Sequence, residues 1–221
     1  MATTECPPLA DRVTKSLLGY GVLAGPFYIV VAAAQVVLRD GFDPTRHAVS
    51  QLANGDFGWV QVVNFLLTGA MTIAAAVGVG RALPGGWLAR AAAVLLAGYG
   101  VGLVAAGLLR ADPSDGFPPG TPAGAASMSW HGVGHFLAAG LGFCCFVAAG
   151  FVVAASFGRM QAAGWAWLSR ITAAFFAVSF GFLASGSGGA AAILLFTAAV
   201  IWAWVWLAAV SVKLYRSVSP A

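Results

Sequence analysis

The chain has 221 residues, of which 60% are hydrophobic and only 8% charged, and its mean hydropathy is +0.88. Soluble domains carry about a quarter charged residues, so this composition excludes an ordinary soluble protein, and the high apolar content excludes an intrinsically disordered one. The net charge of +4 comes from 11 basic and 7 acidic residues without a basic run, so nucleic acid is not an expected partner. An all-α integral membrane protein remains.

Apolar runs long enough to cross a bilayer recur along the whole chain. They predict a bundle of six transmembrane helices, which we take as one transmembrane domain over residues 1–221. The spans are expected near residues 17–38, 59–80, 88–109, 130–156, 168–185 and 190–212.

The connection after the first span, residues 39–58, carries several polar side chains. A turn at Asp43 can begin a short helix that includes Ser50. Arg46 is a candidate contact for an anionic lipid headgroup, and Ser50 is a candidate substrate contact. Alternatively, and in our view more simply, Arg46 pairs with Asp43 or Asp56 within the same connection.

The second span begins with a polar stripe. Gln61, Asn64 and Thr68 stand at positions i, i+3 and i+7, so they share one helix face. That face should turn away from lipid, because an unpaired polar group in hydrocarbon costs several kcal/mol. Gln61 and Asn64 are therefore interhelical hydrogen-bond partners, the reading we favour, or substrate-binding residues.

The connection before the fourth span, residues 110–129, is rich in turn-forming residues. Prolines after Phe117 stiffen it, and Phe117 is expected to dip into the membrane interface as a hydrophobic plug that could touch a substrate. Asp112 and Asp115 are candidate catalytic acids or bases, because a positioned carboxyl can give or take a proton.

Two histidines open the fourth span. His131 and His135 stand at i and i+4 and therefore share a face, where two imidazoles could bind one metal ion, with His47 as a third ligand. Zinc is the candidate cofactor. Two alternatives stay open: the histidines hydrogen-bond loop carboxylates in a structural role, or they act as catalytic acids and bases without a metal.

Tryptophans mark the ends of several spans. Trp59 and Trp130 lie at one end of their helices, where they suit an aromatic belt and are also candidate substrate contacts. The last two spans carry little chemistry. Trp202, Trp204 and Trp206 alternate along the sixth span, and we interpret them as packing and interface residues.

The second and fourth spans begin alike. The segments 59–69 and 130–140 share Trp, Val, Phe, Leu and Gly without a gap, and they align Asn64 with His135. We interpret this as a parallel repeat in which spans one and two correspond to spans three and four. Coincidence in an apolar sequence of low complexity is the alternative.

Basic residues near the span ends predict the orientation. Arg39, Arg46 and Arg110 fall on one side, against eight Lys and Arg on the other, so both termini are expected in the cytoplasm of a multi-pass cell-membrane protein. The connections 39–58 and 110–129 then face outward, together with all three histidines. We expect their ionisable side chains to gather in one outward-facing polar pocket.

Four segments carry further motifs: 41–52 (GFDPTRHAVSQL), 55–65 (GDFGWVQVVNF), 112–122 (DPSDGFPPGTP) and 129–135 (SWHGVGH). In these motifs the chain resembles the bacterial membrane proteins grouped as the domain of unknown function 998 family. The resemblance covers nearly the whole chain. It implies a six-helix bacterial membrane protein and implies no particular activity.

Three functions are compatible with such a pocket. The first is a membrane-embedded enzyme that acts on a lipid or isoprenoid-like substrate by metal-assisted hydrolysis or acid-initiated cyclisation. The second is a non-catalytic protein that binds lipids or a partner. A transporter ranks third, because no span contains a charged side chain near mid-membrane. Membrane lipids and a hydrophobic small molecule are the expected partners.

Overall fold

The computed structural model describes residues 8–124 and 128–218, and this part of the chain is all-helical, without strands. Within it, six helices are long and apolar enough to cross a membrane, as predicted. They are α1 (Leu9–Leu38), α2 (Gly58–Ala82), α3 (Trp87–Leu108), α4 (Trp130–Arg159), α5 (Ala163–Ala184) and α6 (Gly189–Ser217); a short 3₁₀ helix, η1 (Val49–Ala53), precedes α2.

Several helices are longer than the apolar runs that predict them. α1 begins at Leu9, eight residues before the expected start at 17, and α6 ends at Ser217 instead of 212. Charged residues such as Asp11 end an apolar run without interrupting backbone hydrogen bonds. α1 instead begins directly after Pro8, a residue type that suits the first turn of a helix because it lacks an N–H.

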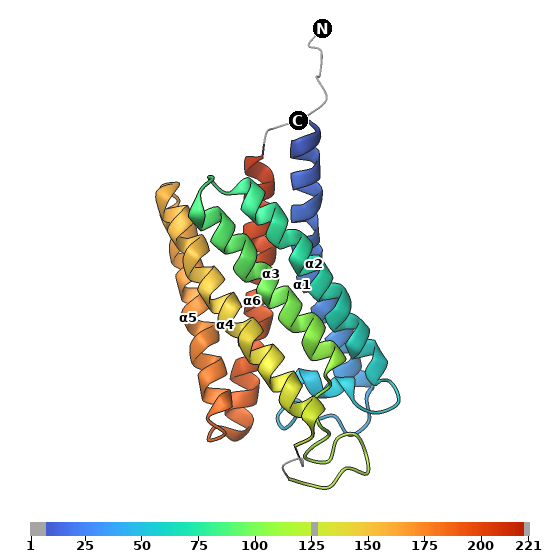
Figure 1. The fold of residues 1–221 in the computed structure, drawn as a ribbon. Helices are drawn as coiled ribbons and strands as arrows, with labels where there is room; N and C mark the ends of the chain where they lie inside the picture. Colours follow the sequence, from blue (N-terminus) through green and yellow to red (C-terminus); the bar gives the residue numbers. More distant parts are fainter. Residues whose placement is uncertain (1–7, 125–127, 219–221) are drawn as a thin grey trace.

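The contacts between the helices close into a ring, and Figure 1 shows the bundle from the side. Each helix packs against the next along the chain, and α6 packs back against α1. α1 begins and α6 ends at one end of the bundle, which we call the terminal end. The opposite end carries the segments 39–57, 109–124 and 128–129, and we call it the loop end.

Aromatic side chains and small residues fill the space between the helices. Trp204 is buried between Tyr28 and Tyr99, with ring centroids 5.2 Å and 5.9 Å away. α3 and α4 approach each other at Gly102 and Gly142, where a methyl group added to Gly102 would lie 2.8 Å from the Gly142 Cα atom. Small residues permit such close packing of helices inside a membrane.

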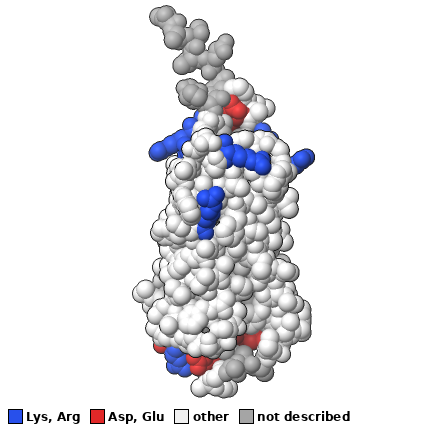
Figure 2. Space-filling model, turned by 90° about the vertical axis from the view of Figure 1, so that its left-hand side faces the viewer, with Lys and Arg blue, Asp and Glu red and all other residues white. Residues whose placement is uncertain are grey.

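Charged side chains lie mainly near the two ends (Figure 2). On the face in view, Lys and Arg gather near the terminal end, whereas acidic and basic side chains lie together at the loop end, and the surface between them is largely uncharged. The basic residues expected on one side of the membrane therefore do share one end of the bundle. The membrane side that this end faces stays a prediction.

Candidate functional site

A cavity of about 440 Å³ lies inside the ring, in the half nearer the loop end. Each of the six spanning helices contributes to its wall, together with Ala48 and with Val49 and Ser50 of η1. Most of the lining is aliphatic or aromatic; the aromatic residues include Tyr28, Tyr99, Phe143, Phe180, Phe196 and Trp204. Cavities of about 300–1,000 Å³ with this mainly apolar character are typical of small-molecule sites.

Polar side chains are sparse in the cavity wall. Besides the two tyrosines and Trp204, whose buried indole N–H has no partner in the part of the chain that the structure describes, they are His135 from α4, Ser50 from the connection before α2, and Thr197 from α6. Within the described residues, no Asp, Glu, Lys or Arg lines the cavity. A molecule inside it would therefore meet an apolar surface with few points for hydrogen bonding.

The position of His135 is set by α3. Its Nδ1 atom lies 2.9 Å from the carbonyl oxygen of Ala106 and 2.9 Å from that of Leu109. Ala106 lies in the last turn of α3 and Leu109 directly follows the helix, where backbone oxygens have no partners within the helix. His135, only 3% exposed, thus caps the end of a neighbouring helix.

This contact determines which nitrogen of the His135 ring carries the proton. A carbonyl oxygen can only accept a hydrogen bond, so Nδ1 is the donor, and Nε2 of the neutral imidazole keeps a lone pair that can accept one. Within the described residues, no protein group bonds Nε2. His135 lines the cavity, and its Nε2 is a hydrogen-bond acceptor held in a fixed orientation.

The segments 39–57 and 109–124 pack together as a lid over the loop end. Phe117 is fully buried at the centre of this lid, where its ring meets the edge of Phe42 at 5.2 Å and the guanidinium of Arg39 at 5.2 Å. Arg39 also donates to the carbonyl oxygens of Leu52 and Asn54, which ties η1 to the end of α1. Phe117 therefore fills the lid and does not line the cavity, and its predicted place in the membrane interface stays a prediction.

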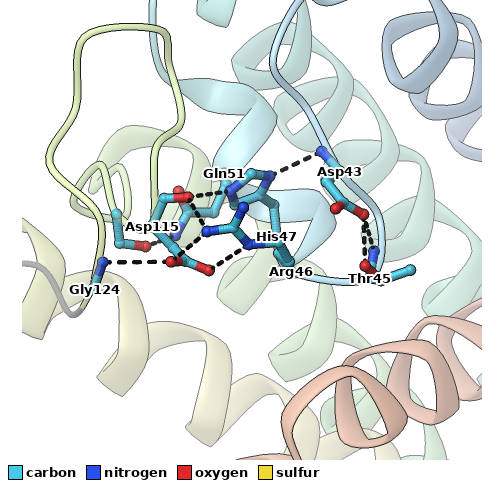
Figure 3. A network of polar contacts seen from close by, with 8 residues as sticks. Asp43, Thr45, Arg46, His47, Gln51, Asp115 and Gly124 are labelled. Atoms are coloured by element: carbon cyan, nitrogen blue, oxygen red, sulfur yellow. Dashed lines mark hydrogen bonds and ion pairs between the residues drawn. The ribbon is translucent and has the colours of Figure 1, made fainter.

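Polar contacts join the two halves of the lid (Figure 3). Arg46 forms an ion pair with Asp115, with 2.8 Å between its nitrogen and the carboxylate oxygen. The prediction that Arg46 pairs with Asp43 or Asp56 was wrong, because folding brings the second connection closer to it. The Asp43 carboxylate instead accepts hydrogen bonds from Thr45.

His47 is part of the same lid and is 2% exposed. Its Nδ1 accepts the Asp43 backbone N–H at 2.9 Å, so its Nε2 carries the proton and donates to the Asp115 carbonyl oxygen at 3.0 Å. Both ring nitrogens are therefore occupied by backbone groups. His47 links the two connections and has no lone pair left for a metal ion.

The predicted three-histidine metal site is not formed. His47 is committed to the lid, and His131 is exposed beside Trp130, with 3.5 Å between the ring centroids. His135 faces the α3 carbonyls. Among the described residues, no group of three or more His, Cys, Asp or Glu side chains is arranged to hold a metal ion. The i, i+4 spacing failed as a guide because it places two rings on one face without directing their nitrogens to a common point.

Asp112 is held at the beginning of α4. Its carboxylate accepts hydrogen bonds from the backbone N–H and the hydroxyl of Ser129, and the Ser129 oxygen in turn accepts the Gly132 N–H and caps the helix. These bonds hold the pKa of Asp112 below its ordinary value, so the carboxyl stays ionised. The assignment of Asp112 and Asp115 as catalytic acids or bases assumed that both face one polar pocket. Neither of them lines the cavity.

Acid should loosen the lid through Asp115. Hydrogen bonds from Arg46, then from the Gly124 amide, lower the pKa of this carboxyl from its ordinary value of 3.8. A lowered pKa means that the pairing contributes fully above the ordinary value and is lost as the pH falls through the lowered one. We expect the thermal unfolding midpoint to fall at strongly acidic pH, and by less in Asp115→Asn. Equal pH profiles for the two proteins would contradict this role.

The remaining predicted site residues do not line the cavity. Gln61 and Asn64 are buried between α1 and α2: Gln61 accepts from Gln35 at 2.8 Å, and Asn64 donates to the Tyr28 carbonyl at 3.2 Å. Gln61 and Asn64 therefore hold α1 and α2 together, in agreement with the interpretation that they are interhelical hydrogen-bond partners. Trp59 and Trp130 are 62% and 71% exposed, as membrane-interface anchors would be, and they do not line the cavity.

Sequence reasoning missed the contribution of the last two helices. Phe180 of α5 and Phe196, Val200 and Trp204 of α6 all line the cavity. The three α6 residues stand at i, i+4 and i+8 and so share one face. This stripe was present in the sequence, but an apolar stripe in a spanning helix usually packs against a neighbour, so it did not suggest a site.

Comparison with known proteins identifies one family. A family model described as "Protein of unknown function (DUF998)" matches residues 22–212, which is most of the chain and includes the cavity and the lid. No curated protein and no solved structure shows a significant match.

Proposed function

The chain belongs to the DUF998 family of proteins of unknown function, whose description assigns no activity, and from its cavity we propose that it binds a hydrophobic small molecule inside the membrane. The loop end faces the outside in this proposal, because basic residues concentrate at the terminal end. The ligand therefore occupies the outer half of the bilayer, beneath the lid.

One observation carries the proposal: His135, an acceptor in a fixed orientation, stands in the wall of a mainly apolar cavity of about 440 Å³. In small-molecule sites, apolar walls pack against the apolar part of the ligand, and a few precisely placed polar groups fix the orientation of the ligand. Packing of helices alone would not require an open space of this size, since protein interiors are normally filled to crystal-like density.

Catalysis is a second candidate function, supported by the fixed tautomer of His135 and by Ser50 in the same cavity wall. An imidazole held through Nδ1–H can take a proton at Nε2, which is how a general base works. Asp112 and Asp115 lie outside the cavity and lend no support to acid-initiated cyclisation. Transport has no specific observation in its favour.

Binding can be tested by extracting the purified protein and identifying retained molecules by mass spectrometry. We expect the wild type to retain a small hydrophobic molecule in near-stoichiometric amount. Ala139→Phe, which fills the cavity wall, should lose it, whereas Ala174→Phe on the exposed surface of α5 should keep it. Equal retention in both variants, or none in the wild type, would refute the proposal. Conversion of the retained molecule by the wild type would identify an enzyme.

A further inference from the structure

The mouth of the cavity lies between α4 and α5. Most lining residues from α1, α2 and α3 are buried, but Phe136 of α4 is 62% exposed and Ala184 of α5 is exposed too. Gly140 and Phe180 stand between these two positions and are half-buried. The cavity therefore reaches the surface along the loop-end halves of these helices, on a side of the bundle formed by apolar side chains.

α4 and α5 spread apart toward the loop end (Figure 1). In their other half they touch closely, since a methyl group added to Gly150 would lie 2.8 Å from the Ala173 Cβ atom. At the mouth, the same addition to Gly140 would meet only the tip of the Phe180 ring, at 3.9 Å. At the mouth, the side chain of Phe180 fills the space between α4 and α5, whereas the two helices touch directly near Gly150. A side chain can rotate out of the way, but a helix backbone cannot.

The size of the cavity limits its occupant. If each non-hydrogen atom takes about the 30 Å³ that a water molecule occupies in the liquid, about 440 Å³ holds roughly 15 such atoms. This is the size of one medium-length hydrocarbon chain with a small head. A phospholipid with two acyl chains is several times larger and could insert at most part of one chain.

The lining limits the charge of the occupant. In the described chain no Lys or Arg lines the cavity, and the nearby Arg46 is paired with Asp115 in the lid. An anionic head would therefore lose its hydration without gaining a counter-ion, which is costly in an apolar site. Nε2 of His135 accepts a hydrogen bond, so a neutral group with an O–H suits it best.

We infer that the cavity takes a neutral single-chain amphiphile with a hydroxyl head, such as an isoprenoid or fatty alcohol, which enters from the membrane between α4 and α5. The inference rests on the proposed binding function and adds the ligand class and the route. Phe180 is the side chain that opens and closes this route, and Gly140 leaves room for it.

The ligand class is tested by competition in proteoliposomes. A diazirine-bearing analogue of tetradecanol should photolabel cavity residues of the wild type, and unlabelled farnesol or tetradecanol should suppress the labelling. Myristate, an anion of equal chain length, should compete at least about tenfold more weakly because its charge is unpaired there. Phosphatidylglycerol should not compete. Equal competition by myristate, or better competition by phosphatidylglycerol, would overturn the ligand class.

The route is tested by the time course of the same labelling. Gly140→Phe should slow it several-fold by narrowing the mouth, and Phe180→Ala should speed it. Gly181→Phe is the matched control, because Gly181 is exposed on α5 with open space around it. Equal rates for Gly140→Phe and Gly181→Phe would exclude this route while leaving binding intact. Absence of cavity labelling in every protein, the wild type included, would instead refute the binding function itself.

Discussion

Replacing His135 by asparagine should yield a stable protein that no longer retains its ligand. Replacing it by glutamine should yield a less stable protein that still retains the ligand. An asparagine amide can reach the position of Nδ1 and donate to the carbonyls of Ala106 and Leu109. It has no atom near the position of Nε2. Glutamine places its terminal amide near Nε2, where its oxygen can accept, and leaves the carbonyls without a donor.

The two variants separate the structural and the binding role of His135. Buried carbonyls left without a partner cost about 1–3 kcal/mol, so the glutamine variant should unfold at a clearly lower temperature than the asparagine variant. Thermal unfolding of the detergent-solubilised protein and mass spectrometry of retained molecules measure the two effects. If stability and ligand retention fall together in both variants, Nε2 has no separate role in binding.

Adding one methyl group at Gly102 should destabilise the protein and disturb the cavity. A Cβ atom there would lie 2.8 Å from the Gly142 Cα atom and 2.9 Å from the Ala138 carbonyl oxygen, and both of these belong to backbone. α3 and α4 would have to move apart. Overpacking of this kind costs about 1–3 kcal/mol, and because Gly102 and Gly142 both line the cavity, ligand retention should fall as well.

Gly19→Ala is the matched control for Gly102→Ala. Gly19 also lies inside a spanning helix, but nothing lies within 4 Å of an added Cβ atom there. Alanine suits a helix better than glycine by roughly 0.5–1 kcal/mol, so this variant should be as stable as the wild type or slightly more. Similar losses of stability in the two variants would show that the close approach of α3 and α4 is not what Gly102 supports.

Hydropathy predicted the six helices because crossing a membrane is a local requirement. Each run had to supply enough apolar residues to match the bilayer, whatever its neighbours were. The sequence also predicted that Gln61 and Asn64 point into the bundle, because a polar stripe that faces hydrocarbon would have no hydrogen-bond partners. The repeat that aligns Asn64 with His135 stays a prediction, although both side chains bond a carbonyl of the preceding helix.

The composition and the order of residues by themselves determined the class of protein, the spans, the family and the separation of charge between the two ends. Only the tertiary structure decided that Arg46 pairs with Asp115, that the three histidines lie in three different environments, and that α5 and α6 complete an aromatic cavity. These features depend on the rotation of each helix within the ring and on the packing of two distant connections. Such properties arise from contacts between residues far apart in sequence, which no local pattern encodes.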